Sequence, residues 1–473
     1  MQSNLKSENG TPVHIANLRF QVFSILWVIA SLFHSIKNRE LDNGFSLLLL
    51  TLASVLFLLD SRSIFRFVVF LLAQITVIYN YMPYVSNHWI FSGFVSITLL
   101  ASIFIQISKE KTFFVSRRAL WDIFAPIVRI ELIILYFFVV IHKLNYDFFN
   151  PAISCGTDLI KGTMGIGFLN LPDSILHWNA HATVIIEVII PLLLIFKKTR
   201  YLGVLIGLLF HNVIAYNNLN GYYDFSSAIF ALYFLFTPPA FGVELRQTLH
   251  RIKGFINHSY HYIRHFELKK FVAYIALSFI CIGMVVLLDS IIKDYVLIFW
   301  TVFSILYIAV FIKTFLTFQV DAEKQFRISY PILLLIPLIL ILNGFSPYIG
   351  FKTENSFAMF SNLRTENGYS NHFFIPANIQ IFDFQKDLVE ITATSDPVLL
   401  GYAQSQRLMT LFDLNKRIST TFPTYVNYTY KGAEYEYVAG QNDPMQLEKR
   451  PPYYLRKLLR FRIINSGANT CTH

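Results

Sequence analysis

The stretch Tyr136-Phe-Phe-Val-Val-Ile-His142-Lys143-Leu-Asn145-Tyr146-Asp147-Phe-Phe149 ends a long apolar run on a histidine and a lysine, and a polar turn follows. An ammonium at the rim of a membrane span is costly unless it snorkels to water, pairs with another group or gives up its proton. Two interpretations of Lys143 therefore stand side by side. It is a snorkelling anchor, or it is a lysine that desolvation keeps neutral so that it can act as a base.

The composition is that of an integral membrane protein. Of the 473 residues, 55% are hydrophobic, 16% aromatic and only 14% charged, against roughly 25% charged residues in soluble domains. The formal net charge is +10, but the basic residues form short clusters between apolar runs, so we expect no nucleic-acid partner. Three cysteines are too few for a disulfide scaffold or a cysteine-rich zinc site, although the pairing of Cys155 with Cys471 stays open.

Apolar runs long enough to cross a bilayer recur as far as residue 349. We therefore predict an α-helical polytopic membrane protein with about eleven spans. They lie near 18–36, 44–59, 64–82, 89–107, 121–142, 179–196, 201–216, 225–238, 271–288, 295–318 and 330–349. Residues 1–17 are polar and have no cleavable signal pattern, so the first span is expected to be a signal anchor.

Lysine and arginine set the predicted orientation. They gather in alternate loops around 62–66, 109–118, 197–200 and 240–270, whereas the intervening loops 81–88 and 217–224 carry none. Basic loops face the cytoplasm, so the N-terminus should be cytoplasmic. Lys143 and the C-terminal region should then lie on the outer, periplasmic or lumenal side, which requires an odd number of spans.

Four regions follow from this pattern: a cytoplasmic tail (1–17), a transmembrane core (18–239), a basic segment with three further spans (240–349) and an outer soluble domain (350–473). The glycine-containing loop 144–178 suggests a segment that dips into the bilayer or lies on it. Residues 240–270 suggest an amphipathic helix on an anionic leaflet or, alternatively, a lipid-head-group pocket.

The outer domain has an α+β pattern and is large enough for a modest core of its own. Residues 379–384 and 388–394 alternate like paired strands, and 402–417 are typical of a helix. The runs 424–430 and 434–438 flank Lys431-Gly432, which indicates a hairpin. A basic helix or tail is expected at 453–461.

Several ionisable residues fall inside the predicted spans. Arg129 and Glu131 suggest a structural pair, and Glu187 lies in the middle of its span. By the predicted topology, His88, Lys143 and His211 all lie near the outer face. A single histidine in a helix is usually a hydrogen-bonded core residue, but two neutral imidazoles beside a desolvated lysine would form a proton-handling site.

No metal site is expected. The candidate ligands are histidines that lack close ligand spacing and a cysteine partner set. They are His142, His177, His181 and His211.

These residues resemble the HTTM-domain family, which includes the vitamin K-dependent gamma-carboxylases. The similarity covers about 18–240 well and 350–372 moderately. Its motifs are Tyr136-Phe with Lys143-Leu, Glu187-Val-Ile-Ile-Pro191-Leu, Phe210-His211, Phe225-Ser, Asn87-His88 and the segment Ser356 to Arg364. Asn362 stands where the gamma-carboxylases have a histidine, and the C-terminal domain is too short to hold their propeptide-binding region.

The resemblance implies an enzyme, a lyase or oxygenase, that uses a reduced naphthoquinone of the vitamin K or menaquinol type. It implies Lys143 as the base and His88 as its assistant. Asn87, His211, Met359, Asn362 and Arg364 are the expected substrate- or quinone-binding residues, with Met359 to Arg364 folded back as a lid on a membrane pocket. The partners would be the lipid bilayer and an exported peptide or protein substrate. Two alternatives are a non-catalytic maturation or immunity partner for an exported peptide, and a quinone or lipid binder without turnover.

Overall fold

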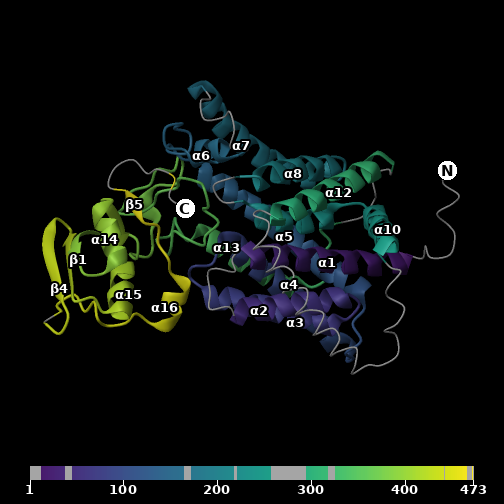
Figure 1. Cartoon of the computed structure of the whole chain (residues 1–473), viewed down its shortest axis with the longest axis horizontal. Coiled ribbons are helices and arrows are strands. Elements are labelled where there is room, and N and C mark those ends of the chain that lie inside the picture. Colours follow the sequence, from purple (N-terminus) through teal and green to yellow (C-terminus); the bar gives the residue numbers. More distant parts are fainter. Residues whose placement is uncertain are drawn as a thin grey trace. The chain divides into compact units, whose positions relative to one another are not determined.

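The computed structural model describes residues 12–37, 45–163, 172–217, 221–256, 295–317, 325–441, 443–465 and 471. The chain divides into two compact units, whose helices and strands are labelled in Figure 1. The first comprises Met1–Asn80, Ser92–Ile133 and Ile189–Pro337. The second comprises Tyr81–Phe91, Ile134–Val188 and Leu338–His473, so it is assembled from three separate stretches of sequence.

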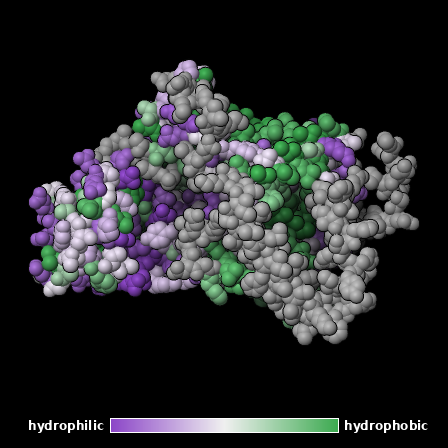
Figure 2. Space-filling model, viewed as in Figure 1, coloured by the Kyte–Doolittle hydropathy of each residue, from purple (hydrophilic) through white to green (hydrophobic). Residues whose placement is uncertain are grey.

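Long apolar helices support a multi-pass membrane protein. Within the described residues, six helices are long and apolar enough to cross a bilayer. They are α1 (Pro12–Lys37), α3 (Ile64–Tyr81), α4 (Asn87–Glu110), α5 (Arg117–Lys143), α7 (Asp173–Ile195) and α12 (Tyr295–Thr317). Figure 2 shows hydrophobic residues gathered over the helices, and large exposed side chains such as Phe65, Phe104 and Leu316 suit lipid better than water.

The predicted count of about eleven spans is not established. Four further apolar segments are helical but short: α2 (Phe45–Leu59), α8 (Arg200–Ala215), α9 (Tyr223–Tyr233) with η3 (Phe234–Phe236), and η6 (Pro331–Leu334) with α13 (Leu335–Phe345). The 15 residues of α2 extend about 22 Å, less than the hydrocarbon thickness of about 30 Å. The predicted span 271–288 lies outside the described residues. Of the predicted amphipathic segment, α10 (Pro239–Ile256) is helical.

The expected pairing of Arg129 with Glu131 is wrong. The Arg129 guanidinium donates to the carbonyl oxygens of Leu235, at 2.9 and 2.7 Å, and Gln325, at 2.6 Å. The Glu131 carboxylate accepts from the Thr98 hydroxyl at 2.5 Å. Residues two apart on a helix point in different directions, so both groups find partners on other elements of the first unit.

The second unit contains a five-stranded antiparallel sheet with the order β4-β3-β1-β2-β5. Its strands are β1 (Leu388–Thr394), β2 (Arg407–Thr410), β3 (Tyr425–Tyr430), β4 (Ala433–Val438) and β5 (Ile464–Asn465). The predicted strand at 388–394 and the hairpin are confirmed, with Tyr425 opposite Val438 and Tyr430 opposite Ala433. The core of this sheet contains Val389, Ile391, Leu414 and Val426.

Two predictions for this region are wrong. The segment 402–417 is α14 (Pro397–Gln404), then β2, then α15 (Leu411–Thr421). Gln406 has a left-handed φ of 50°, which ends the first helix, and the Thr410 hydroxyl accepts from the Asp413 amide to begin the next. The expected strand at 379–384 is a short helix, η7 (Ala377–Ile379), followed by irregular chain. There the consecutive amides of Ile381 and Phe382 both donate to the Ile349 carbonyl, which a strand ladder does not allow.

At 453–461, α16 (Tyr453–Leu458) is the expected basic helix.

Candidate functional site

Lys143 is held by a carboxylate. Its ammonium donates to both oxygens of Glu187, at 2.5 Å to Oε1 and 2.6 Å to Oε2. The two side chains are only 7% and 8% exposed, and the ammonium lies 5.7 Å from the ring centre of Phe148. The snorkelling interpretation is therefore wrong, because Lys143 is buried within the protein and its charge is met by Glu187.

The turn after α5 explains how this pair forms. Asn145 ends the helix through its side chain. The side-chain Nδ2 donates to the His142 carbonyl at 2.8 Å, and the side-chain Oδ1 accepts from the backbone amide of Phe148 at 2.9 Å. Phe148 then packs against Ala180 and Val184 of α7. Since Val184 and Glu187 lie three residues apart on one helix, this packing turns Glu187 toward the end of α5.

His142 is bound on both ring nitrogens. Nε2 lies 3.1 Å from the Ser356 carbonyl and Nδ1 lies 3.0 Å from the Tyr348 hydroxyl. Because a carbonyl only accepts, Nε2 carries a proton, and a neutral imidazole then accepts from Tyr348 at Nδ1. His142 is thus a fixed link between α5 and the segment that follows α13.

His372 is bound in the same way. Its Nε2 donates to the Ile141 carbonyl at 2.8 Å, while Nδ1 accepts from the amides of Phe374 and Ile375, each at 3.0 Å. Burial lowers the pKa of His372, and the hydrogen bond to Ile141 only partly offsets this effect. An antiparallel bridge between Asn145 and His372 joins the two segments next to Lys143.

The segment 355–362 is not a free linker. Four of its non-glycine residues have a left-handed backbone: Asn355, Phe357, Phe360 and Asn362. Such conformations are costly for phenylalanine and persist where surrounding contacts fix them. Phe357 is only 2% exposed and packs on the rings of Phe91 and Phe138.

The predicted binding residues Asn87 and Asn362 hold backbone groups. Asn87 Oδ1 accepts from the Phe357 amide at 2.7 Å. Asn362 Oδ1 accepts from the Cys155 amide at 2.7 Å, and its Nδ2 donates to the Ile153 carbonyl at 2.9 Å. Met359 is half-buried, and the Arg364 guanidinium lies 5.5 Å from the ring centre of Tyr369. Asn87 and Asn362 are thus buried positioning residues, each of which fixes the backbone of another stretch of the second unit.

The predicted hydrogen bond between Lys143 and His88 does not form among the described residues. Within the part of the chain that the structure describes, no direct hydrogen bond joins Lys143 to His88, and Glu187 occupies the ammonium instead. His88 Nε2 lies 3.4 Å from the Ser86 hydroxyl. His211 belongs to the first unit, where its ring packs beside Phe225 and Tyr233.

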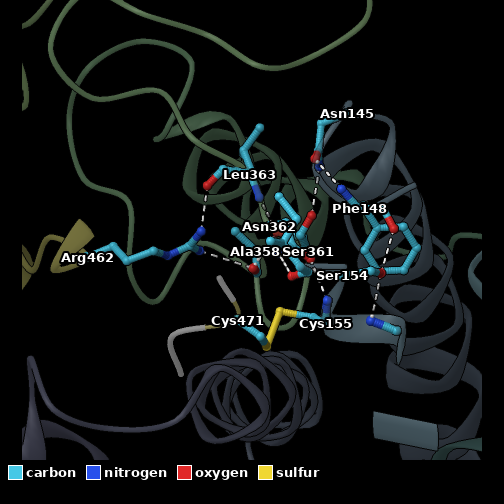
Figure 3. The surroundings of a disulfide bond; sticks show 12 residues. Asn145, Phe148, Ser154, Cys155, Ala358, Ser361, Asn362, Leu363, Arg462 and Cys471 are labelled. Atoms are coloured by element: carbon cyan, nitrogen blue, oxygen red, sulfur yellow. Dashed lines mark hydrogen bonds between the residues drawn. A yellow bond between two sulfur atoms is a disulfide. The ribbon is translucent and has the colours of Figure 1, made fainter. Parts of the chain in front are cut away.

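Figure 3 shows two anchors of the second unit: a disulfide that the sequence left open, and a buried arginine that the sequence did not indicate. A disulfide joins Cys155, the first residue of α6 (Cys155–Gly162), to Cys471, across 316 positions of sequence. The buried Arg462 donates to the carbonyls of Ala358, at 3.3 Å, and of Leu363. Both anchors tie the C-terminal part of the chain to earlier stretches of the second unit.

Lys352 is a second buried lysine. It is 4% exposed, and within the described ranges its side chain has no hydrogen bond or ion pair. Burial lowers its pKa from 10.5 to about 8. In the unfolded chain the pKa of Lys352 is 10.5, so the side chain stays protonated up to that pH. Below pH 8 folding buries the charged ammonium, which lowers the free energy of unfolding. This loss of stability disappears as the pH rises from 8 to 10.5.

We therefore expect Lys352→Met to raise the free energy of unfolding at pH 7 by about 1–3 kcal/mol, since methionine fills the same volume without a charge. Thermal unfolding of the purified protein in detergent measures this gain, which should shrink at pH 10. Lys449→Met, at an exposed position, serves as the control and should change stability little. A gain that is the same at pH 7 and pH 10 would show that charge burial is not its cause.

Comparisons of the chain with protein-family models, with curated proteins and with solved structures find no match. The site must therefore be interpreted from its own chemistry. A buried amine and a buried carboxylate in direct contact can exchange a proton, and the ring of Phe148 lies beside the amine. Such a pair suits proton abstraction from a weakly acidic hydroxyl.

Proposed function

We propose that the protein is an HTTM-type multi-pass membrane enzyme in which Lys143 is the general base. The observation that supports this most strongly is the buried contact between Lys143 and Glu187, 2.5 Å apart. When the proton shared along this hydrogen bond resides on Glu187, the amine of Lys143 is free to take a proton from a substrate.

The proposed substrate is a reduced naphthoquinone. The residues present fit such a molecule: an amine, a carboxylate and the rings of Phe138, Phe148 and Phe357 in the same unit. When bound, a reduced naphthoquinone and dioxygen give the quinone epoxide and water, and this chemistry supplies a base strong enough to remove a carbon-bound proton before carbon dioxide adds. Lys143 would take the hydroxyl proton, and its ammonium would then stabilise the oxyanion.

Glu187 has two roles in this proposal. It holds the Lys143 amine in one position, and it provides the acceptor that receives the proton of the resting ammonium. Asn145 and His142 fix the end of α5, so that the amine is placed by rigid elements rather than by a loop.

The disulfide supports the proposed orientation. Disulfides persist in oxidising compartments, and Cys155 and Cys471 both lie in regions expected on the outer side. We propose that the N-terminus is cytoplasmic, and that Lys143 and the C-terminal domain face the periplasm or lumen. An exported peptide or protein would then be the acceptor for carboxylation.

The test is an assay of the purified full-length protein with reduced naphthoquinone and oxygen, in which the epoxide is quantified by chromatography. We expect wild type to form epoxide. Lys143→Ala and Lys143→Arg should lose turnover alike, because a guanidinium does not give up its proton. Lys449→Arg, at an exposed position, is the matched control and should keep full activity.

Two results would overturn the proposal. An active Lys143→Arg variant would exclude Lys143 as the base. A folded wild-type protein that forms no epoxide would favour the alternatives, a quinone or lipid binder or a non-catalytic partner of an exported peptide; co-purification of a peptide would select the latter.

A further inference from the structure

Two histidines lie side by side at the start of α7. His177 and His181 are four residues apart, and their ring centres are separated by 4.6 Å. Residues at this spacing share one face of a helix. This pair therefore has the spacing at which a helix presents two ligands to a single ion. The sequence had been expected to lack such close spacing among His142, His177, His181 and His211.

The tautomer of a neutral His181 is set by its own helix. Its Nδ1 lies 3.0 Å from the His177 carbonyl oxygen. A carbonyl only accepts, so Nδ1 carries the proton and the lone pair of Nε2 is left for another partner. A hydrogen bond from the second ring nitrogen to a carbonyl is also what orients metal-binding histidines.

The ring of His181 is held in place by aromatic neighbours. The ring of Phe149 lies 4.7 Å from it and that of Trp178 lies 6.0 Å from it, measured between ring centres. The ring of His177 is exposed and makes no hydrogen bond within the described residues. One imidazole is therefore fixed while the other is free to adjust.

We propose that His177 and His181 form a binding site for a divalent transition-metal ion of the copper, nickel or zinc class. Imidazole nitrogens suit these ions, whereas magnesium and calcium require oxygen ligands. With metal–nitrogen bonds of about 2.0–2.1 Å, two tetrahedral ligand atoms lie about 3.3 Å apart, which adjacent rings on one helix face can reach. Two protein ligands leave coordination positions open to water or to a ligand from solution.

Trp178 provides a direct readout. It is 68% exposed and lies next to the pair, whereas Trp27, Trp89, Trp121 and Trp300 are buried. Titration of Cu²⁺ into purified, untagged full-length protein should quench Trp178 fluorescence saturably, with one ion per chain. Zn²⁺ added first should prevent the quenching.

Variants separate a built site from collisional quenching. His177→Ala and His181→Ala should each raise the midpoint of the titration about tenfold or more, and Trp178→Phe should remove the signal. Ser174→Ala, at an exposed position of the same helix, is the matched control and should titrate like wild type. His177 is exposed, so its alanine variant should fold normally. Unsaturable quenching, or midpoints unchanged in both histidine variants, would show that no such site exists.

Discussion

Glu187→Leu is expected to lower the free energy of unfolding by about 3–5 kcal/mol, because it leaves the ammonium of Lys143 buried without a counter-charge. Lys143→Leu should lower the free energy of unfolding by a similar amount, because it leaves the Glu187 carboxylate buried without a counter-charge. The double variant should recover most of the loss, since two leucines of suitable volume can replace a buried ion pair without leaving a charge behind. Unfolding of purified protein in detergent, followed by circular dichroism, measures all three.

The ion pair between Lys313 and Glu244 is the matched control for this cycle. Its nitrogen and oxygen are 2.7 Å apart, but the lysine side chain is 60% exposed. Its coupling energy should stay below about 1 kcal/mol. If Glu187→Leu proved as mild as Glu244→Leu, Lys143 would have to reach water or give up its proton without Glu187, and the proposed role of Glu187 would be wrong.

Cys471→Ser should lower the free energy of unfolding by about 2–5 kcal/mol, because the disulfide to Cys155 closes a loop spanning 316 positions. The variant should still fold, since Arg462 separately binds the carbonyls of Ala358 and Leu363. The measurement is thermal unfolding with and without a reductant.

Reductant should bring wild type to the stability of Cys471→Ser and leave the variant unchanged. A wild-type protein that unfolds at the same temperature in both conditions would contradict a stabilising disulfide. If Cys471→Ser is less stable than wild type but still forms epoxide, the disulfide contributes to stability and not to the proposed activity.

The helices were predictable because their signal is local. Apolar runs that end at charged or turn residues set α1, α3, α4, α5, α7 and α12 within a few residues of the predicted spans. The sheet was only partly predictable. The hairpin around Lys431-Gly432 has a local turn signal, whereas the break at Gln406 depends on a left-handed residue that composition does not reveal. The segment 379–384 alternates like a strand, but it lacks the backbone partners of one.

The site was half predictable. Lys143 stood out because a charge at the end of an apolar run is costly, and the same reasoning applied to Glu187 would have paired the two. The buried side chain of Arg462 could not be identified, because its partners are backbone carbonyls that no sequence pattern marks. His88 was expected beside Lys143, but proximity in a predicted topology does not determine which group fills a hydrogen-bonding position.

The second unit is discontinuous in sequence, and this has a consequence for biosynthesis. A ribosome releases Lys143 and Glu187 long before Ser356, His372, Arg462 and Cys471, which fix the end of α5 and the segment around it. A nascent chain can therefore insert its early helices and form the ion pair while the rest of the site is still missing. Completion of the site therefore has to wait for the synthesis of Cys471, and it includes an oxidation.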